Sequence, residues 1–486
     1  MKSLVKIASI SCLCLIFASC RQQDKTAHME DRYPQIFPDY AGVTVPPNIA
    51  PLNFMVTEEN TEVVKMNCIP QNGNPITMNS KQKIRFPEKK WKKMLQNNHN
   101  GTLMIEISVK RAGQWVRFRS FDIHVAPDPI DSYLAYRLID PGYVIWKHMG
   151  IYQRCLESFD ETPVITNRLT DGNCMNCHSF CRNDPNTMLF HMRDIHAGTM
   201  IWQNGQLRKL DTGTEQIVSR GVYPSWHPSG RFVAFSTNVT RQNFHAIKNK
   251  KVEVWDAKSD IVVLDIEENK LLKNNLLMSK THFETFPAWS PDGQYLYFCS
   301  ADSLSMPDQY DRLKYNLLRI GFDPVTQSFS TQIDTIISAR KTGKSISFPR
   351  VSPDGKYLLF TQSGYGNFSI WHKDADLYLL HLATGELSTL PEVNSNDTES
   401  YHTWSSNSRW FVFSSRRIDG LYTRSYFSWV DENGTAHKPF LLPQKDPEHS
   451  FWLMKSYNVP ELIRGKIHVS PYRINQMARQ PEEKPE

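Results

Sequence analysis

Residues 223–230 read Tyr-Pro-Ser-Trp-His-Pro-Ser-Gly, and residues 286–293 read Phe-Pro-Ala-Trp-Ser-Pro-Asp-Gly. A third copy, Phe-Pro-Arg-Val-Ser-Pro-Asp-Gly, covers 348–355, and a degraded fourth copy covers 401–408. In the first three copies proline presets φ and glycine supplies a positive φ, which together favour a tight turn. A short aromatic stretch typical of a strand follows every copy. Each copy therefore predicts a β-hairpin.

These hairpins belong to a longer internal repeat. After each hairpin comes a second pair of alternating strands with its own turn. Four strands per unit, repeated along the second half of the chain, indicate a β-propeller. The fold class we expect is all-β, with a WD-like propeller of about six blades over residues 185–475. An early blade would contain 188–192 and 199–205, and the segment after Phe451 would complete the last blade.

The chain before the repeats has a different pattern. Alternating apolar and polar residues, separated by turn clusters, run over 43–126 and predict a small β-sandwich-like domain. We expect residues 127–184 to form an aromatic-rich connector that packs against the propeller. The polar residues 476–486 predict a disordered tail.

The first residues have the pattern of an export signal. Lys2 and Lys6 precede an apolar run over 7–17 that is too short to span a bilayer. The run ends in Phe-Ala-Ser-Cys20, which resembles the bacterial lipobox. The resemblance implies a signal peptide over 1–19 and acyl chains such as palmitate on Cys20. The alternative is an ordinary cleaved signal that ends near a cysteine.

Such an anchor would place the protein in the cell envelope. Residues 20–42 would form a lipid-anchored tether. Arg21, rather than the aspartate that commonly retains lipoproteins in the inner membrane, follows Cys20, so we expect the outer membrane. The expected partners are the membrane itself and an envelope or redox protein. The net charge of +6 over 486 residues gives no sign of a nucleic-acid partner.

Residues 174–178 read Cys-Met-Asn-Cys-His, the pattern to which a c-type haem is attached. Cys174 and Cys177 would form the thioethers, and His178 would be the axial ligand of the haem iron. An exported protein passes through the compartment in which such haems are attached. The segment just downstream offers four candidates for the sixth ligand of the iron, which are Met188, His191, Met192 and His196.

Other chemistry is open to the same cysteines. An oxidising compartment permits a disulfide, either Cys174–Cys177 or one of these with Cys181 or Cys155. Together with Cys181, the motif could also form a Cys₃His zinc site. Thiol–disulfide exchange lacks the βαβ context that it needs. A haem site does not require Cys181, and a Cys155–Cys181 bond would account for that residue.

Several residues have a structural interpretation beside a functional one. His191 and Met192 lie in an expected strand, where such side chains are more often packed than ligating. Glu284 and Glu399, with His282 and His402 near them, could form a ring at the propeller channel, but glutamates there more often bind backbone amides. Arg416 and Arg417 are expected at a solvated rim. The sequence has no Gly-x-Ser-x-Gly, His-Glu-x-x-His or phosphate-loop motif, which leaves an enzymatic activity without a candidate site.

The repeat, with its aromatic-Pro-x-Trp-Ser-Pro-Asp-Gly pattern, resembles the WD-like repeats of TolB-type propellers. The whole chain resembles exported Bacteroidetes-type lipoproteins that combine such a propeller with one Cys-x-x-Cys-His. The resemblance implies the architecture and says little about activity. Two functions follow as hypotheses. One is an envelope-anchored electron-transfer protein with a covalent haem. The other is a non-redox propeller that binds envelope proteins or glycans, with the cysteines as a disulfide staple and with zinc or no cofactor.

Overall fold

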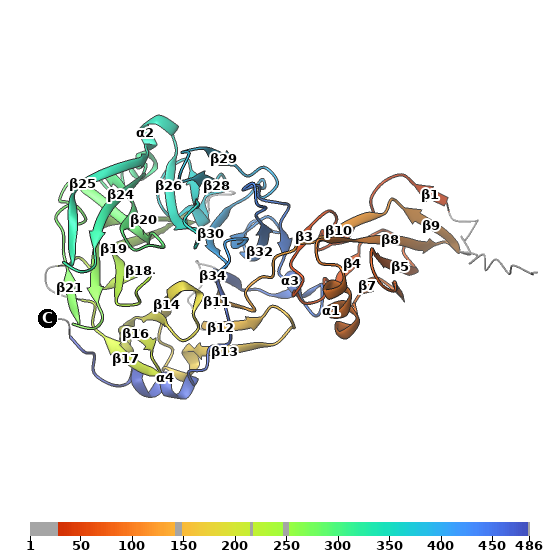
Figure 1. The fold of residues 1–486 in the computed structure, drawn as a ribbon, viewed down its shortest axis with the longest axis horizontal. Coiled ribbons are helices and arrows are strands. Elements are labelled where there is room, and N and C mark those ends of the chain that lie inside the picture. Colours follow the sequence, from red (N-terminus) through yellow and green to blue (C-terminus); the bar gives the residue numbers. More distant parts are fainter. Residues whose placement is uncertain (1–27, 141–147, 214–216, 246–251, 485–486) are drawn as a thin grey trace, which may run out of the picture.

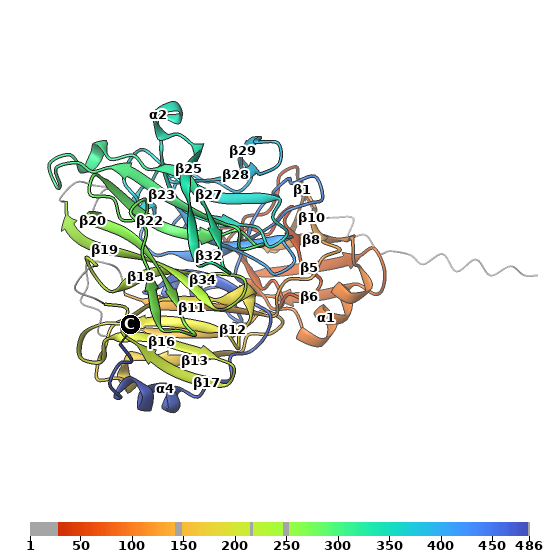
Figure 2. The same cartoon turned by 60° about the vertical axis from the view of Figure 1, so that its left-hand side comes forward.

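The computed structural model describes residues 28–140, 148–213, 217–245 and 252–484. Within these ranges the chain forms a propeller of six four-stranded sheets and a separate N-terminal β domain (Figures 1 and 2). The all-β prediction is confirmed. Signal peptide and Cys20 lie outside the described residues. Among the described residues we find no helix long and apolar enough to cross a membrane.

The six sheets are given in order around the ring, each from its inner to its outer strand. The first is β34 (Ser456–Ile463), β11 (Tyr133–Ile139), β12 (Gly150–Cys155) and β13 (Glu161–Thr166). The second is β14 (Met175–Phe180), β15 (Met188–Met192), β16 (Gly198–Gln203) and β17 (Gln206–Leu210). The third is β18 (Gly221–Trp226), β19 (Phe232–Phe244), β20 (Val252–Asp265) and β21 (Lys270–Leu272). The fourth is β22 (His282–Trp289), β23 (Tyr295–Asp302), β24 (Asn316–Asp323) and β25 (Ser328–Ile337). The fifth is β26 (Ser345–Val351), β27 (Tyr357–Ser363), β28 (Asp376–His381) and β29 (Leu387–Thr389). The sixth is β30 (Glu399–Trp404), β31 (Trp410–Ser415), β32 (Arg424–Trp429) and β33 (Phe440–Leu441).

The ring closes through its two ends. Strand β34, near the C-terminus, pairs antiparallel with β11 and so completes a sheet that otherwise comes from residues 133–166. Neighbouring inner strands contact one another all the way round, from β34 through β14, β18, β22, β26 and β30 back to β34. The segment after Phe451 thus supplies a strand, as expected, but it completes the first sheet of the ring.

The repeated tryptophans tie neighbouring sheets together. The indole of Trp289 donates to the Ser225 carbonyl of the preceding inner strand at 3.1 Å, and that of Trp404 donates to the Arg350 carbonyl at 3.0 Å. A buried indole N–H needs such a partner. The conspicuous Trp of the repeat therefore packs between blades and satisfies its nitrogen on the backbone next door.

The N-terminal domain is β-sandwich-like, with one larger and one smaller sheet and a helix, α1 (Glu88–Asn97). The larger sheet contains β1 (His28–Glu30), β3 (Thr44–Val45), β5 (Val63–Pro70), β6 (Ile76–Ser80), β8 (Gly101–Arg111), β9 (Gln114–Phe118) and β10 (Phe121–Val125). The smaller sheet contains β2 (Ile36–Phe37), β4 (Phe54–Val56) and β7 (Lys83–Ile84). Its core is continuous with apolar residues of the sixth and first sheets, among them Trp410, Phe440 and Leu462.

Three expected boundaries were wrong. The connector 127–184 contains the whole of β11 to β14, because its aromatic residues pack as propeller strands instead of against them. The tail 476–486 is ordered as far as it is described. It follows α4 (Pro471–Ala478), and Glu483 bridges to Leu210 and pairs with Arg208 at 2.5 Å. The described part of the tether 20–42 includes β1 and β2 of the N-terminal domain.

Two further helices are a single turn long, α2 (Ala339–Thr342) and α3 (His449–Trp452). The long hairpin β19–β20 is more important for the site. Beyond the register shift between Asn238 and Thr240, the two strands of the hairpin extend past the other strands of the third sheet. There it contacts the short helical turn 369–371 of the fifth sheet and so covers one end of the propeller.

Candidate functional site

All six inner strands carry the same β-bulge. At one residue of each strand the pairing shifts and φ becomes positive, so the alternation of side chains is interrupted. The six residues, with φ between 46° and 53°, are Cys177, Tyr223, Phe286, Phe348, Tyr401 and Val459.

The bulge aligns the haem-type motif with the propeller repeat. Cys177 and His178 take the place of Tyr223 and Pro224 in the next strand, and Phe180 takes the place of Trp226. The residue after the bulge is proline in four inner strands, and it is His178 and His402 in the other two. This alignment could have been found in the sequence, because residues 177–180, Cys-His-Ser-Phe, have a large apolar residue in fourth place, as the other copies of the repeat do. Sequence reasoning missed it.

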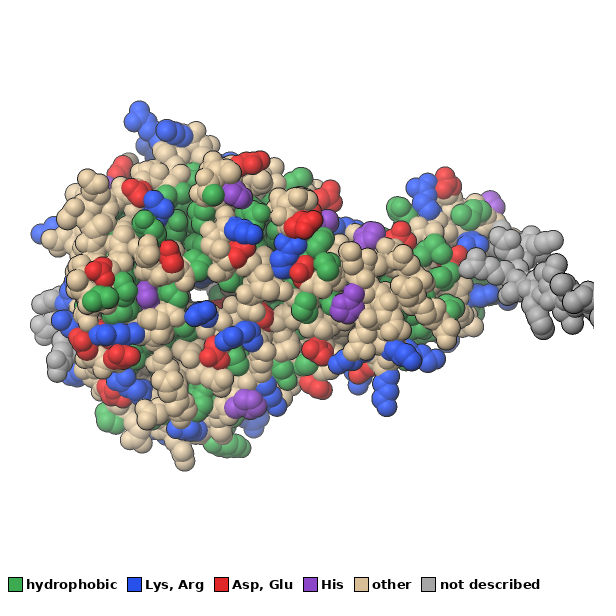
Figure 3. Space-filling view, viewed as in Figure 1, with side chains coloured by type: hydrophobic (Ala, Val, Ile, Leu, Met, Phe, Trp, Pro, Cys, Tyr) green, Lys and Arg blue, Asp and Glu red, His purple; other side chains and the backbone are tan. Residues whose placement is uncertain are grey.

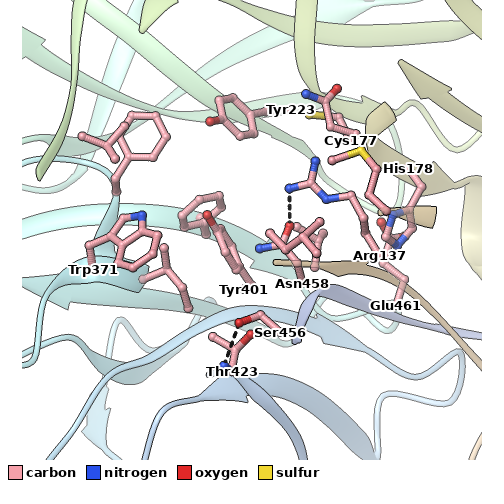
Figure 4. A pocket seen from close by; sticks show the side chains of 18 of the residues that line it. Arg137, Cys177, His178, Tyr223, Trp371, Tyr401, Thr423, Ser456, Asn458 and Glu461 are labelled. Atoms are coloured by element: carbon pink, nitrogen blue, oxygen red, sulfur yellow. Dashed lines mark hydrogen bonds between the residues drawn. The ribbon is translucent and has the colours of Figure 1, made fainter. Parts of the chain in front are cut away.

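The bulge also explains how the residues of this motif come to line one cavity. Residues three apart point to opposite faces of a regular strand. Because the bulge lies at Cys177, both Cys174 and Cys177 line the same cavity as His178. The cavity has a volume of about 300 Å³ and lies at the centre of the propeller, where Figure 3 shows an opening. Figure 4 shows Cys177 and His178 on one side of it.

Four of the bulge residues build an aromatic arc around the propeller axis. Successive ring centroids lie 4.7 Å apart from Tyr223 to Phe286, 4.0 Å from Phe286 to Phe348, and 4.8 Å from Phe348 to Tyr401. The two remaining positions of the ring hold the smaller Val459 and Cys177. The missing aromatic rings leave space on that side, which the cavity occupies.

His178 is buried, with 2% of its surface exposed. Burial and the nearby charge of Arg137 lower its pKa to about 3, although hydrogen bonds to the backbone of Val459 and Ala135 act in the opposite direction. The imidazole is therefore neutral, and within the described part of the chain its Nε2 has no hydrogen-bond partner. His402 is equally buried, and its ring nitrogen lies 3.0 Å from the Leu359 carbonyl. Both histidines thus fill the same kind of gap between blades.

Basic side chains surround the cavity. Arg137, Arg193, Arg350 and Arg416 line it, together with the acids Asp140 and Glu461. Arg137 donates to Asn458 at 2.7 Å and to the Met175 carbonyl at 3.2 Å (Figure 4). Arg416 lies over the ring of Trp371 at 3.9 Å.

Arg350 and Glu461 mark the lower limit of this cavity. They stand two residues after the bulge, where the other inner strands have serine, alanine or threonine. Both also line a second cavity, so these two residues lie where the two cavities adjoin. Burial raises the pKa of Glu461 to about 8, and Arg350 counteracts this in part.

The hairpin β19–β20 closes the cavity from above. Thr240, Gln242 and Val254 of this hairpin line the cavity. A buried carboxylate, Asp256, fixes the hairpin to the fifth sheet, since it accepts from Asn367 at 2.7 Å and from Asn238 at 2.6 Å. The cavity roof therefore depends on a polar cluster that is shielded from water.

None of the four candidates for a sixth ligand lines this cavity. Met188 and Met192 lie in the core of the second sheet. His191 is buried and bonded to the Thr199 hydroxyl at 3.0 Å. His196 lies 2.9 Å from Asp171. These side chains project from β15 and the turn after it, and the inner strand β14 separates β15 from the axis.

The cysteine alternatives have a clear structural outcome. All six described cysteines, Cys155 and Cys181 included, are free thiols, so none of the disulfides raised from the sequence is present. Cys181 points to the next blade, with its Sγ 3.6 Å from the His227 carbonyl. Among the described residues no group of three or more His, Cys, Asp or Glu side chains is arranged to hold a metal ion, and this includes the Cys₃His set.

Glu284 and Glu399, which could have formed a ring of acids, do not line the central cavity. Glu399 accepts from Ser395 and Ser415 and pairs with Arg417 at 2.9 Å. Glu284 is buried, which raises its pKa to about 8, and it receives the Ser279 amide. The structural interpretation of both glutamates agrees with these contacts. His282 is half-exposed beside Asp302, and His402 alone of the four lines the cavity.

The residues around the cavity fit a c-type haem in chemical terms. Cys174, Cys177 and the neutral His178 line one space, and the Nε2 of His178 is buried without a hydrogen-bond partner among the described residues. Aromatic rings and guanidinium groups supply the apolar and cationic walls that a porphyrin with two carboxylates would need.

Six four-stranded sheets around one central cavity define a β-propeller protein. No family model matches this chain, and no curated protein matches it. Among solved structures it is similar to an oligogalacturonate lyase in complex with manganese, at 11% identity and a TM-score of 0.25, over 59% of this chain and 55% of that one. It is similar to prolyl endopeptidases at 10% identity and a TM-score of 0.35, over 79% of this chain and 50% of that one. It is also similar to Porphyromonas gingivalis dipeptidyl peptidase 4, at 11% identity and a TM-score of 0.30, over 64% and 52%.

The chain spans about half the length of each of these three proteins, which are β-propeller proteins. Similarity at this level carries no argument about activity. The function has to be argued from the cavity.

Proposed function

We propose that the central cavity holds one covalent c-type haem and that the protein transfers electrons in the cell envelope. The observation that carries the proposal is the convergence of Cys174, Cys177 and His178 on one cavity. A regular strand would not place them together, and the bulge at Cys177 does.

Each of these residues has a separate task in the proposal. The two thiols would hold the haem covalently, and the Nε2 of His178 would ligate the iron. The bound haem would supply one-electron exchange. His178 is buried between blades, and this packing restricts the rotation of its ring. The aromatic arc and the hairpin β19–β20 would exclude water from the bound group.

Absorbance tests the proposal. The protein is produced in a host with cytochrome c maturation and compared with the C177S variant. We expect a reducible Soret band and α band in the wild type, and a haem that stays attached under denaturing conditions. Loss of attachment is expected in C177S. A colourless wild-type protein whose Cys174 and Cys177 thiols both react with a thiol reagent would contradict the proposal.

A second function is a non-redox binding propeller. The observation that favours it is that His178 fills the same inter-blade position as His402 and the repeat prolines, so the residue has a structural role without haem. If this is the function, the protein purified from the same host is colourless. The H178P variant then folds normally, because four other blades have proline at the position of His178.

We also propose that Cys20 anchors the protein to the outer membrane. This rests on the sequence alone, since residues 1–27 lie outside the described part of the chain. Labelling of cells with radioactive palmitate tests it. The wild type should incorporate the label and sediment with outer membranes, and C20S should do neither. Label-free, soluble wild-type protein would contradict it.

A further inference from the structure

The central cavity has more positive charge than its own residues neutralise. Arg350 donates to the Pro349 carbonyl at 3.0 Å, and Arg137 donates to the Asn458 amide and to a carbonyl. Arg193 donates to Asn176 at 3.2 and 3.3 Å when the Asn176 amide is turned so that its oxygen faces it. In the described part of the chain these partners are neutral oxygens, not carboxylates.

The three arginines come from different blades and meet at one space. Arg137 belongs to β11 of the first sheet, Arg193 follows β15 of the second, and Arg350 lies on β26 of the fifth. Arg137 and Arg350 are partly buried and Arg193 is exposed. Guanidinium groups that are bonded only to neutral oxygens remain able to bind an anion. The planar fork of arginine suits carboxylates in particular.

The acids of the cavity do not cancel this charge. Glu461 also lines the cavity, but burial raises its pKa to about 8, and the nearby charge of Arg350 counteracts this only in part. Asp140, which follows β11 of the first sheet, lines the cavity as well. Two acids are thus set against three guanidinium groups, without counting Arg416.

We propose that Arg137, Arg193 and Arg350 form a site for a ligand with two carboxylate groups. Two sources share this chemistry. One is the pair of propionates of a haem attached at Cys174 and Cys177, in which case the inference rests on the proposed function. The other is a free small dicarboxylate that binds to the propeller by itself.

The variants are chosen so that they fold. R350S introduces the residue that two other inner strands, at Ser179 and Ser225, have in the same position. R193Q changes an exposed side chain. The matched control is R319Q, because Arg319 pairs with Asp334 on the outer strands of the fourth sheet, away from the cavity. Circular dichroism and thermal melts confirm folding of all three.

The experiment titrates succinate, with uncharged succinamide as the comparison, into protein made without cytochrome c maturation and into protein made with it. We expect the haem-free protein to bind succinate and not succinamide. R350S and R193Q should each weaken binding about tenfold or more, which is the effect of losing a charge-assisted hydrogen bond, and R319Q should not.

The two preparations distinguish the sources. If only the haem-free protein binds succinate, and R350S alters the reduction potential of the attached haem, the site belongs to the haem propionates. Equal binding by both preparations, or binding when no haem ever attaches, assigns it to a free dicarboxylate, and in the latter case the proposed function fails while this inference stands. No succinate binding by haem-free protein, and no change of haem potential in R350S or R193Q, would overturn the inference.

Discussion

Cys177 and Tyr223 occupy the same position in neighbouring inner strands, with φ of 52° and 48° at the same bulge. Tyr223 begins an arc of four aromatic rings that contact one another edge-on or tilted, and Cys177 is where the arc stops. A residue of the repeat that normally fills the centre of the propeller is thus replaced by a thiol. The space that results is the candidate site.

This equivalence predicts that an aromatic residue is tolerated at Cys177. The C177Y variant restores the repeat residue, so we expect it to fold with a melting temperature close to that of the wild type. It should lose both haem attachment and succinate binding, since the ring fills the cavity. C181S is the control, because Cys181 lies against the next blade and outside this cavity, and it should keep both properties. If C177Y retains haem attachment, the cavity has been assigned wrongly.

His178 and His402 form a natural matched pair. Both are buried, both follow a bulge residue, and burial lowers the pKa of each to about 3. Replacement by alanine should destabilise the fold by a similar amount in both variants, of about 2–3 kcal/mol for a lost buried side chain. Only H178A should change the spectrum of attached haem. The two are compared by urea unfolding and by absorbance of the reduced protein, and equal spectral changes would argue against His178 as the ligand.

The propeller could be predicted from the sequence because proline, glycine and tryptophan mark its turns locally. The copies of the repeat that contain Cys177 and Val459 were not predictable in the same way, since neither has the aromatic residue or the Trp that marks most of the other copies. The sixth-ligand candidates were chosen by their nearness in sequence to His178. They proved to lie away from the cavity because β15 is the second strand of its blade, and a strand order cannot be obtained from spacing alone.

Residues far apart in the sequence build the rest of the cavity. Arg137, Arg350 and Glu461 meet only because β34 closes the ring beside β11. Nothing in the local sequence of these three residues separates them from surface charges. The arginine cluster is therefore a property of the closed fold and needs the structure to be seen.

The roof of the cavity should open when its polar cluster is weakened. Asn367 donates to the buried carboxylate of Asp256, and its replacement by alanine leaves that oxygen with one partner fewer, at a cost of about 1–3 kcal/mol. We expect N367A to fold but to exchange the amide hydrogens of 240–244 and 252–256 faster. Mass spectrometry of exchanged peptides measures this, with the outer-strand peptide 328–337 as internal control. Unchanged exchange in the hairpin would show that other contacts hold it.

His191 should make stability depend on pH. Burial is the main cause that lowers its pKa to about 3, and Arg193 and Arg220 add to it. The unfolded chain binds a proton at this residue near its ordinary value of 6.5, whereas the folded chain does not until about pH 3. The free energy of unfolding is therefore unaffected above pH 6.5 and falls as the pH drops from 6.5 towards 3. At about pH 4.5 this one residue should cost about 3 kcal/mol relative to about pH 7.5.

The H191N variant isolates this effect, because asparagine keeps a polar partner for Thr199 and does not titrate. We expect the wild type to lose about 3 kcal/mol more than H191N between about pH 7.5 and about pH 4.5, measured by urea unfolding. His178 and His402 remain in both proteins, so a common decline is expected as well. Parallel losses in the two proteins would mean that His191 gains a proton in the folded state, and hence that β15 is open to water at low pH.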